Sequence, residues 1–583
     1  MTIKWRGAAA FGLAAAMTLA ACGQQAAPGA SPTAAGTAAA TPAARGAGGE
    51  LKILYWQAVT VLNTHHSQGT KDYDGGRLVI EPLAHMGPDG KPVPALAAEI
   101  PTVANNGVSK DLTTITWKLK PNVKWSDGSE FTSADVVFTY KYVTDKDTAA
   151  TDASSYDGIK SVEAVDKTTV KVTYTAPNPN IYQAFTAGYG NILQEKQYKD
   201  FIGAKAKDGP KIPVGTGPYK VNEFKPNDVV TYVINDNYRE PNKPFFKTVQ
   251  FKGGGDATSA ARAVFQTGES DYSWNLQVEN AVLNPMIQAA ESKAVFISAV
   301  SPNVERLLVN RTNPDSALGD KRGEPDQPHP FLTDLKVRQA LAMAVDRKPI
   351  AELYGAGGEA TCNIVTGLPE YQSKNTANLS VCKSDMAAAN KLLDDAGATK
   401  GADGKRSYKG KPMKILYQTT VNPLRQKEQE IVKAGWTQLG IDVELKSVNA
   451  GVFFGRDGND TAGKFFSDIE MFTNGAESPD PTNYLSGWTC GEIKTKAAGW
   501  AGNNYERWCN KDYDTLFGQL KAETDSAKRN DIIIKLNDLL VTDVVVIPLV
   551  ARRSPVSGVN KLLKGIKPNP WDSEMWNIAD WTK

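Results

Sequence analysis

Residues 117–138 begin Trp117-Lys118-Leu119-Lys120-Pro121-Asn122-Val123-Lys124-Trp125-Ser126-Asp127-Gly128 and continue, after two residues, with Phe131-Thr132-Ser133-Ala134-Asp135-Val136-Val137-Phe138. Polar and apolar residues alternate over 113–119, which predicts a half-buried strand. Asp127-Gly128 is a turn signal. Thr132 or Ser133 can then cap a helix. The stretch therefore predicts a strand, a turn and a helix in close succession.

Strand and helix patterns continue to alternate along the chain. Strands are expected at 51–55, 413–418, 441–448 and 544–550, and a hairpin at 162–174. Helices are expected at 334–351, 423–439 and 525–541. No internal repeat is present. This alternation predicts an α/β fold with mixed sheets flanked by helices.

The first 22 residues have the composition of a secretory signal. Lys4 and Arg6 precede the apolar run Ala8–Ala16, and Leu19-Ala20-Ala21 precedes Cys22. The apolar run is too short to span a membrane, which takes about 20 residues. The end of the leader resembles the lipobox of bacterial lipoproteins, in which the cysteine is acylated and becomes the first residue. We therefore expect 1–22 to be a lipoprotein signal peptide and Cys22 to carry a lipid.

Residues 23–49 are expected to form a flexible tether. They are almost all Ala, Gly, Pro, Ser, Thr and Gln, with no aromatic residue and one charge, Arg45. Such a segment cannot bury enough apolar surface to offset its ordering entropy. No later stretch has the length and apolarity of a transmembrane helix, so the lipid is expected to be the sole contact with the membrane.

Composition argues against several classes of function. The net charge is +2, and removal of Lys4 and Arg6 leaves 64 basic and 64 acidic residues, which gives no electrostatic footprint for nucleic acid. The four histidines lack H-E-x-x-H spacing and no G-x-S-x-G occurs, so no catalytic residue, metal site or cofactor is expected. The 12 tryptophans and 20 tyrosines suit a buried site for a polar ligand.

Four cysteines beyond Cys22 fall into two local pairs, Cys362 with Cys382 and Cys490 with Cys509. Export to an oxidising compartment favours disulfides. Four cysteines allow three pairings, of which the local one is preferred. A zinc site is the alternative, but no C-x-x-C is present. Each local bridge would close a loop of about 20 residues, worth roughly 3 kcal/mol.

Several segments together resemble the family 5 extracellular solute-binding proteins, the lipoprotein receptors of peptide ABC importers. The resemblance begins with residues 117–138 and continues, in the family's order, with Val214-Gly215-Thr216-Gly217-Pro218-Tyr219, Val337-Arg338-Gln339-Ala340-Leu341, Asp346-Arg347, Leu392-Leu393 and Ile547-Pro548-Leu549. It spans about 51–583. Gly215 and Gly217 are expected to supply backbone angles that other residues resist, in a turn between domains.

The resemblance implies a two-lobed, periplasmic-binding-protein-like fold with a hinged cleft between the lobes. Domain I would comprise 50–83, 212–301 and 551–583. Domain II would be an insertion at 84–211, and domain III would comprise 302–550. The protein would be a monomer that captures a peptide and delivers it to ABC permease subunits with a cytoplasmic ATPase. It would act in the periplasm or at the outer face of the cytoplasmic membrane, anchored through Cys22.

The resemblance also implies where the ligand binds. One acidic residue of the family pairs with the peptide's free amino group, and the matching segment here is Asn474-Gly475-Ala476-Glu477-Ser478-Pro479-Asp480-Pro481. Glu477 falls on the acidic position, although the family has aspartate there and an aromatic residue where Asn474 stands. A buried carboxylate needs an opposite charge, which an ammonium supplies. Asp480 is the second candidate, although Asp-Pro also marks turns.

Two further segments are expected to form walls of the cleft. Trp56 and Gln57 follow the first strand, where an open α/β sheet presents its ligands. Trp274 and Asn275 follow a segment that resembles the family's Gly-Glu-x-Asp strand. The tryptophans would pack on ligand side chains and the amides would bond the ligand backbone. Burial in the core is the alternative for each tryptophan.

Two alternatives to peptide capture remain open. The same fold could bind a non-peptide solute, such as a metal chelate, a sugar, haem or an opine, and the altered segment around Glu477 keeps this possibility open. A secreted hydrolase is the alternative from another class of protein, against which the missing nucleophile–base constellation argues.

Overall fold

A computed structural model of the chain describes residues 44–67, 69–290, 293–455, 458–476, 478–500 and 502–583. The leader, Cys22 and Glu477 lie outside the described residues, as does most of the expected tether. Its last residues are described, and there the expectation is wrong: Gly46 N and Gly48 N donate to the carbonyls of Pro244 and Phe245. The fold therefore begins several residues earlier than position 50.

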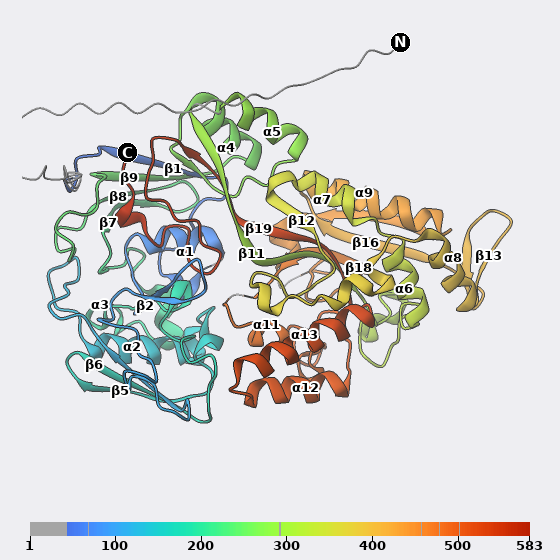
Figure 1. The fold of residues 1–583 in the computed structure, drawn as a ribbon, viewed down its shortest axis with the longest axis horizontal. Coiled ribbons are helices and arrows are strands. Elements are labelled where there is room, and N and C mark those ends of the chain that lie inside the picture. Colours follow the sequence, from blue (N-terminus) through green and yellow to red (C-terminus); the bar gives the residue numbers. More distant parts are fainter. Residues whose placement is uncertain (1–43, 68, 291–292, 456–457, 477, 501) are drawn as a thin grey trace, which may run out of the picture. The chain divides into compact units, whose positions relative to one another are not determined.

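An eleven-stranded mixed sheet runs through two lobes (Figure 1). The first lobe holds residues 44–293 and 561–583, and the second holds 310–545. The strand order is β17 (Asp442–Val448), β16 (Lys414–Thr420), β18 (Ile469–Asn474), β11 (Ala294–Val309), β19 (Val546–Asn560), β10 (Tyr272–Ser273), β1 (Glu50–Tyr55), β9 (Thr248–Gly253), β8 (Val229–Ile234) and β7 (Tyr219–Lys225), with β12 (Gly358–Ala360) on β19.

Two long strands, β11 and β19, carry the chain between the lobes (Figure 1). They pair antiparallel from Ala294 opposite Asn560 to Leu308 opposite Val546. The ladder is irregular between Ser298 and Val304, the stretch that contains Pro302. A proline has no N–H to donate to a ladder, so pairing is weakest where the strands leave one lobe for the other.

The first lobe has separate hydrophobic cores. One core lies against the main sheet and is formed by residues within 51–80, 219–274 and 559–581. Another core is formed by residues within 83–206. The second region holds the sheet β4 (Thr114–Lys118), β6 (Thr169–Tyr174) and β5 (Ile159–Asp166), with α2 (Ser133–Thr144). The other elements of the lobe are α1 (Thr70–Arg77), β2 (Ala84–Met86), β3 (Pro92–Pro94), α3 (Glu195–Tyr198), α4 (Ala257–Arg262) and α5 (Asn280–Ala289).

The second lobe covers its part of the sheet with helices. Its largest core joins 307–309, 331–354 and 413–471, and a second core lies between the sheet and the last two helices. The helices are α6 (Leu335–Met343), α7 (Arg347–Tyr354), α8 (Met386–Asp395), α9 (Pro423–Gln438), α10 (Ala450–Phe453), α11 (Thr482–Ser486), α12 (Lys511–Ala522) and α13 (Ser526–Thr542), and β13 (Ala398–Lys400), β14 (Arg406–Tyr408) and β15 (Lys411–Pro412) form a small sheet.

The stretch 117–138 folds as its sequence predicts. Trp117 on β4 and Trp125 in the following turn are both about 1% exposed. Thr132 caps α2, where its hydroxyl accepts from Ala134 N and Asp135 accepts from Thr132 N. This capping box satisfies backbone donors that the first turn of a helix leaves free.

The Gly-Thr-Gly-Pro-Tyr turn needs glycine for a different reason than the sequence predicts. Gly215 and Gly217 do not have the positive φ that favours glycine. Instead a Cβ on Gly215 would lie 1.9 Å from Val79 O, and one on Gly217 would lie 2.7 Å from it. Close approach of two backbones excludes a side chain here.

The helix expected at 334–351 is two helices. α6 ends at Met343, and Asp346 begins α7 by accepting a hydrogen bond from Lys348 N. Asp346 is extended, with φ −87° and ψ 110°, so it cannot continue a helix. A good N-cap residue in the middle of an apolar pattern interrupted the predicted helix.

A buried carboxylate ties the crossing strands to the second lobe. Glu305 on β11 is fully buried and meets Arg425 of α9 at 2.9 Å and Arg552 of β19 at 3.5 Å. Thr473 of β18 also donates to it. Burial raises the pKa of Glu305, but the two guanidinium groups outweigh burial and lower it. The charge is therefore held inside the lobe by partners from three elements.

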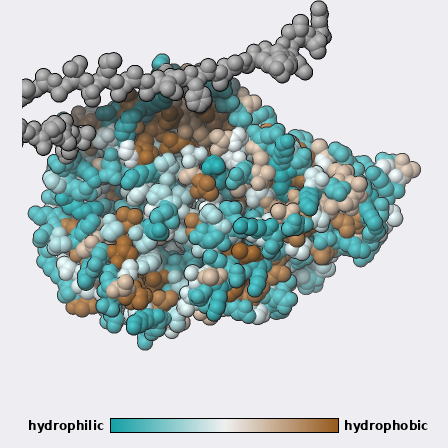
Figure 2. Space-filling view, viewed as in Figure 1, coloured by the Kyte–Doolittle hydropathy of each residue, from teal (hydrophilic) through white to brown (hydrophobic). Residues whose placement is uncertain are grey.

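Both expected disulfides are present. Cys362 and Cys382 are joined with Cα atoms 5.7 Å apart, and Cys490 and Cys509 with Cα atoms 4.7 Å apart. The local pairing of the four cysteines is confirmed. Among the described residues, no helix is long and apolar enough to cross a membrane. In the space-filling view, hydrophilic residues cover most of the visible face (Figure 2).

Candidate functional site

Three adjoining cavities lie between the lobes and form one cleft. The central cavity has a volume of about 180 Å³, the inner cavity about 240 Å³ and the outer cavity about 520 Å³. Asn474, Gly475 and Trp571 line both the central and the inner cavity. The central and outer cavities share Ser154, Asn180, Gln183 and Asn483.

The chain enters the cleft where β18 ends. Asn474 is the last residue of the strand and is exposed, and its Oδ1 accepts from Gly475 N at 2.8 Å. A Cβ on Gly475 would lie 2.2 Å from Pro302 O of β11, so only glycine lets the chain pass over the crossing strand. The segment then turns into α11, where Asp480 Oδ1 accepts from Thr482 N at 2.8 Å.

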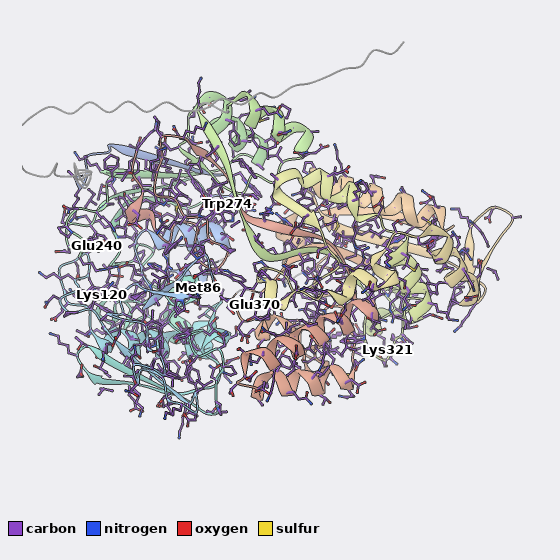
Figure 3. The ribbon with its side chains drawn as sticks, in the orientation of Figure 1. Met86, Lys120, Glu240, Trp274, Lys321 and Glu370 are labelled. Atoms are coloured by element: carbon purple, nitrogen blue, oxygen red, sulfur yellow. A yellow bond between two sulfur atoms is a disulfide. The ribbon has the colours of Figure 1, made fainter. Side chains whose placement is uncertain are left out.

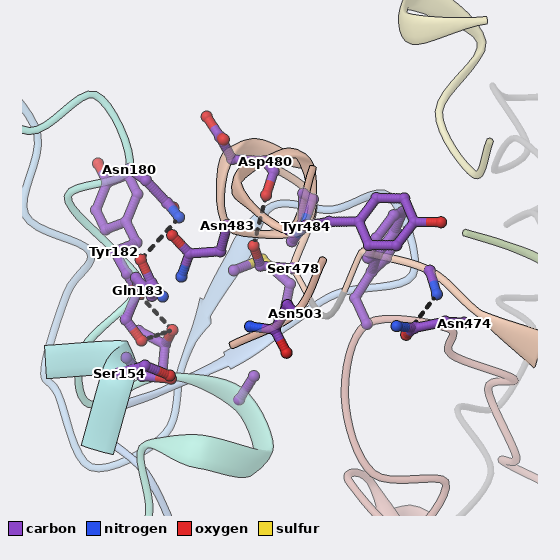
Figure 4. A pocket seen from close by; sticks show the side chains of 18 of the residues that line it. Ser154, Asn180, Tyr182, Gln183, Asn474, Ser478, Asp480, Asn483, Tyr484 and Asn503 are labelled. Atoms are coloured by element: carbon purple, nitrogen blue, oxygen red, sulfur yellow. Dashed lines mark hydrogen bonds between the residues drawn. The ribbon is translucent and has the colours of Figure 1, made fainter. Parts of the chain in front are cut away.

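The central cavity is lined by carboxamides and aromatic rings. Asn180 and Gln183 come from the first lobe and face Asn483 of α11 across the cavity (Figure 4). Asn474 and Asn503 bring further amides, and the rings are Tyr182, Tyr484, Trp488, Tyr505 and Trp571. Amides both donate and accept hydrogen bonds, so the lining suits a polar ligand that displays both kinds of group.

The inner cavity is acidic. Asp74, Asp572 and Glu574 line it. Asp572 meets Arg77 at 2.6 Å, whereas Asp74 accepts from Tyr55 and Ser573, and Glu574 accepts from Tyr272 and Ser557. Burial raises the pKa of Asp74 to about 6. Burial and the nearby Asp74 raise the pKa of Glu574 to about 8. One side of the cleft therefore carries two acids, Asp74 and Glu574, that form no ion pair with any residue that the structure describes.

The expected binding segment lines the cleft. Asn474, Gly475 and Asp480 all border the central cavity. Asp480, however, is already paired, because its Oδ2 lies 2.5 Å from Arg529 Nη2. Glu477 lies outside the described residues. Its role as a partner of the ligand's amino group stays a prediction.

The other expected walls lie apart from these cavities. Trp274 is 5% exposed and stacks on Tyr55 with ring centroids 4.6 Å apart, and Trp56 Nε1 donates to Asn275 O at 2.9 Å. None of Trp56, Gln57, Trp274 and Asn275 lines the central, inner or outer cavity. Trp274 lies beside the crossing strands, apart from Met86 of the central cavity (Figure 3). The tryptophans pack in hydrophobic cores, and the role of these four residues as walls of the cleft stays a prediction.

Sequence reasoning missed most of the lining. Asn180, Tyr182 and Gln183 lie in a loop without a recognisable motif. Arg306 of β11 offered a signal, because it and Glu305 are charged and stand in a strand that is otherwise uncharged. A charge in a buried strand needs a partner or a ligand. Within the described residues, no three His, Cys, Asp or Glu side chains gather as ligands for a metal ion.

Comparison with known proteins gives the same family along most of the chain. Residues 91–496 match the bacterial extracellular solute-binding proteins, family 5 (middle region). A dipeptide-binding protein of Pseudomonas aeruginosa is 24% identical over 493 residues, which cover 81% of this chain and 84% of the relative. The dipeptide-binding protein DppE of Bacillus subtilis is 24% identical over 521 residues, covering 84% of each chain.

Solved structures share the fold. NikZ from Campylobacter jejuni, in complex with Ni(L-His), superposes with a TM-score of 0.73 at 22% identity, covering 92% of this chain and 99% of that one. The oligopeptide-binding protein AppA from Bacillus subtilis, in complex with a nonapeptide, gives a TM-score of 0.73 at 21% identity with the same coverage. Both lobes are therefore matched together.

We expect Glu574 to make stability depend on pH. Its pKa rises from an ordinary 4.5 to about 8, so the folded protein holds a proton that the unfolded chain releases between these values. Stability is then full below 4.5 and falls as pH rises, by up to about 1.4 kcal/mol per pH unit. Glu574→Gln keeps an acceptor for Tyr272 and cannot titrate. Urea unfolding from about pH 5 to pH 8 should show a shallower slope in the variant, and an unchanged slope would contradict the assignment.

The two disulfides form a matched pair with different consequences for the cleft. They span 20 and 19 residues, so replacing either pair by serine should cost a similar free energy of unfolding, about 3 kcal/mol. Only the loop closed by Cys490–Cys509 carries Asn503 and Tyr505 of the central cavity. Amide hydrogen exchange at these two residues should accelerate only in the variant in which serines replace Cys490 and Cys509. Equal acceleration in the 362/382 variant would contradict a local role.

Proposed function

The chain belongs to the bacterial extracellular solute-binding proteins of family 5, and on this premise we propose that it captures peptides in the interlobe cleft for an ABC importer. The observation that carries the proposal is that Asn474, Gly475 and Ser478 to Asp480, from the segment that matches the family's amino-group site, border the central cavity. Relatives over more than four-fifths of the chain are named as dipeptide-binding proteins. The cleft would present backbone-binding amides on both sides.

We also propose the wider setting. The protein would be exported by residues 1–22, held at the outer face of the cytoplasmic membrane or in the periplasm through a lipid on Cys22, and would act as a monomer with permease and ATPase subunits. Within the folded part, domain I would comprise 50–83 together with the preceding 46–49, 212–301 and 551–583. Domain II would comprise 84–211 and domain III 302–550. The separate hydrophobic cores support this division.

A non-peptide solute is the second candidate. Five carboxamides and five aromatic rings border the central cavity. Amides that bond polar groups and rings that cover apolar faces also suit a sugar. The solved relatives include one in complex with Ni(L-His) and one in complex with agropinic acid, so the fold accommodates such ligands. A peptide is favoured here by the curated relatives and by the place of the 474–481 segment.

The amino-group partner can be tested directly. If Glu477 pairs with a ligand ammonium in the closed cleft, Glu477→Gln should weaken binding by about 2–5 kcal/mol, because the ammonium loses its counter-charge. Acetylating the peptide's amino group should weaken binding to the wild type by a similar amount. The two losses should not add, since both remove one interaction. Calorimetry of the wild type and of Glu477→Gln, each with free and with acetylated peptide, measures the four binding free energies.

Asp480→Asn is the matched control variant for Glu477→Gln in these binding measurements. Its carboxylate already pairs with Arg529, so the variant should lose stability while still discriminating between free and acetylated peptide. If acetylation costs the wild type nothing, Glu477 does not bind the amino group. If Asp480→Asn abolishes the discrimination instead, the ammonium partner is Asp480.

Closure of the lobes is the expected response to ligand. Bending would occur where the β11–β19 ladder is irregular, between Ser298 and Val304. Small-angle scattering should therefore give a smaller radius of gyration for the wild type with saturating peptide than without it. The Glu477→Gln variant at the same peptide concentration is the control for unbound protein. An unchanged radius at confirmed saturation would contradict a hinge.

A further inference from the structure

His65 is completely buried and uses both of its ring nitrogens. It lies in a short helical turn, Thr64–His66, that precedes α1. Its Nδ1 lies 2.7 Å from Asp152 Oδ2, and its Nε2 lies 2.8 Å from the carbonyl oxygen of Asn191. A carbonyl oxygen only accepts hydrogen bonds, so Nε2 must carry a proton. An ionised carboxylate also only accepts, so the contact at Nδ1 requires a second proton between the two groups.

The second proton makes this buried contact attractive. With this proton, His65 and Asp152 together carry no net charge. Without it, the lone pair of Nδ1 would face a carboxylate oxygen at 2.7 Å, and a buried negative charge would stay uncompensated. No other hydrogen bond to the Asp152 side chain comes from a residue that the structure describes, and its Oδ1 has no partner there. The imidazole is therefore the group that neutralises this acid.

A second histidine of the chain has the opposite protonation at the same distance. His329 Nε2 lies 2.7 Å from Asp468 Oδ1, but its Nδ1 accepts from the backbone N–H groups of Phe331 and Leu332. Nδ1 of His329 therefore keeps its lone pair, and a single proton on Nε2 satisfies the ring. Of these two pairs, the one at His65 needs a proton that a neutral imidazole does not have.

Further titratable groups around the pair are His66, Tyr142, Tyr156 and Arg77. The tyrosines keep their protons, because burial and the carboxylate of Asp152 raise their pKa values. The charge of Arg77 is compensated by Asp572 at 2.6 Å. Burial and the charge of His65 lower the pKa of His66. Burial also lowers the pKa of His65, but Asp152 and the Asn191 carbonyl outweigh burial and raise it. The second proton therefore belongs to the pair at His65.

The pair holds one wall of the cleft in place. Asp152 precedes a short helical turn whose Ser154 and Ser155 line the central cavity. On the other side of Asp152, the backbone N–H and the hydroxyl of Thr151 donate to the carbonyl of His65 at 2.8 and 3.2 Å. His65 thus binds this segment through both its side chain and its backbone, although the two are 87 residues apart in the sequence.

We propose that His65 and Asp152 form a pH-sensitive latch, in which His65 positions the wall of the cleft that carries Ser154 and Ser155. While the pair holds its second proton, the segment 151–156 stays fastened to His65. Loss of that proton replaces an attraction by the repulsion between a lone pair and a carboxylate, and the segment is released. This inference goes beyond the proposed function, because it does not depend on which solute the cleft binds.

The direction of the pH dependence follows from the protonation of the pair. The folded protein raises the pKa of His65 above its ordinary value of 6.5, so release of the segment is accompanied by loss of a proton between these two values. The latch is complete below pH 6.5 and is lost as pH rises through the folded pKa.

Amide hydrogen exchange of the folded protein measures the latch without any ligand. The amides of Thr151 and Ser155 donate to the carbonyls of His65 and Asp152, so their protection reports whether the segment is fastened. After correction for the intrinsic exchange rate, this protection should be constant below pH 6.5. Above it, protection should fall by up to about tenfold per pH unit, the effect of one proton, and then level off.

Three variants separate the latch from other effects of pH. His65→Gln cannot titrate, so the fall in protection above pH 6.5 should disappear. Asp152→Asn can donate to an unprotonated Nδ1 or accept from a protonated one, so its contact should persist on both sides of that pH. His329→Gln removes the other histidine–aspartate pair, in the second lobe, and should keep the wild-type profile.

A flat profile in the wild type, or an unchanged profile in His65→Gln, would overturn the proposal. Loss of the profile in His329→Gln would overturn it as well, because the pH effect would then not be local to this pair. If His65→Gln does not fold, Asp152→Asn decides, since the latch requires a flat profile there too. NMR of the four histidine rings gives a second readout. The ring signal that His65→Gln removes should titrate above pH 6.5, and a midpoint at or below 6.5 would contradict the latch.

Discussion

The buried charge of Glu305 is the interaction on which the cleft depends. It stands on a strand that crosses between the lobes, and its partners come from β19, β18 and α9. Removing one partner of such a buried group typically costs about 3–5 kcal/mol. The network fixes three strands at the point where they reach the cleft. Side chains alternate along a strand, so Glu305 facing inward places its neighbour Arg306 on the cleft face.

Charges elsewhere in the cleft are mostly neutralised within one lobe. Asp480 pairs with Arg529 and Asp572 pairs with Arg77, each inside its own lobe. Such pairs leave each wall intact when the lobes separate. Among the described residues, Asp74 and Glu574 of the inner cavity have no cation as a hydrogen-bonded partner, and Arg306 lines the central cavity. The carboxamides between them can serve a peptide backbone, whose groups alternate as donors and acceptors.

Much of the fold could be predicted from the sequence, because several short motifs determine local structure through interactions between residues that are close in the chain. The capping residue Thr132, the turn at Asp127-Gly128 and the two cysteine pairs act over few residues, and all were found as expected. The helix expected at 334–351 was wrong because Asp346 favours an N-cap over continuation. The periodicity of the apolar residues, from which this helix was predicted, is not changed by a single capping residue.

Sequence motifs reached only part of the cavity lining. Asn474, Gly475 and Asp480 belong to the segment that the resemblance indicates, and they border the central cavity. Trp56 and Trp274 do not, because a tryptophan after a strand can pack on its own sheet as well as on a ligand, and Tyr55 provides the surface for Trp274. Arg306 borders the cavity together with rings that are distant in sequence, which no local pattern records.

Native mass spectrometry of the mature protein, purified without denaturation, would identify the solute that the interlobe cleft holds. A cleft that captures peptides should retain peptides from the host, so we expect bound masses that fragment as short peptides and disappear after unfolding and refolding. A bound sugar, metal chelate or other non-peptide solute would contradict this expectation.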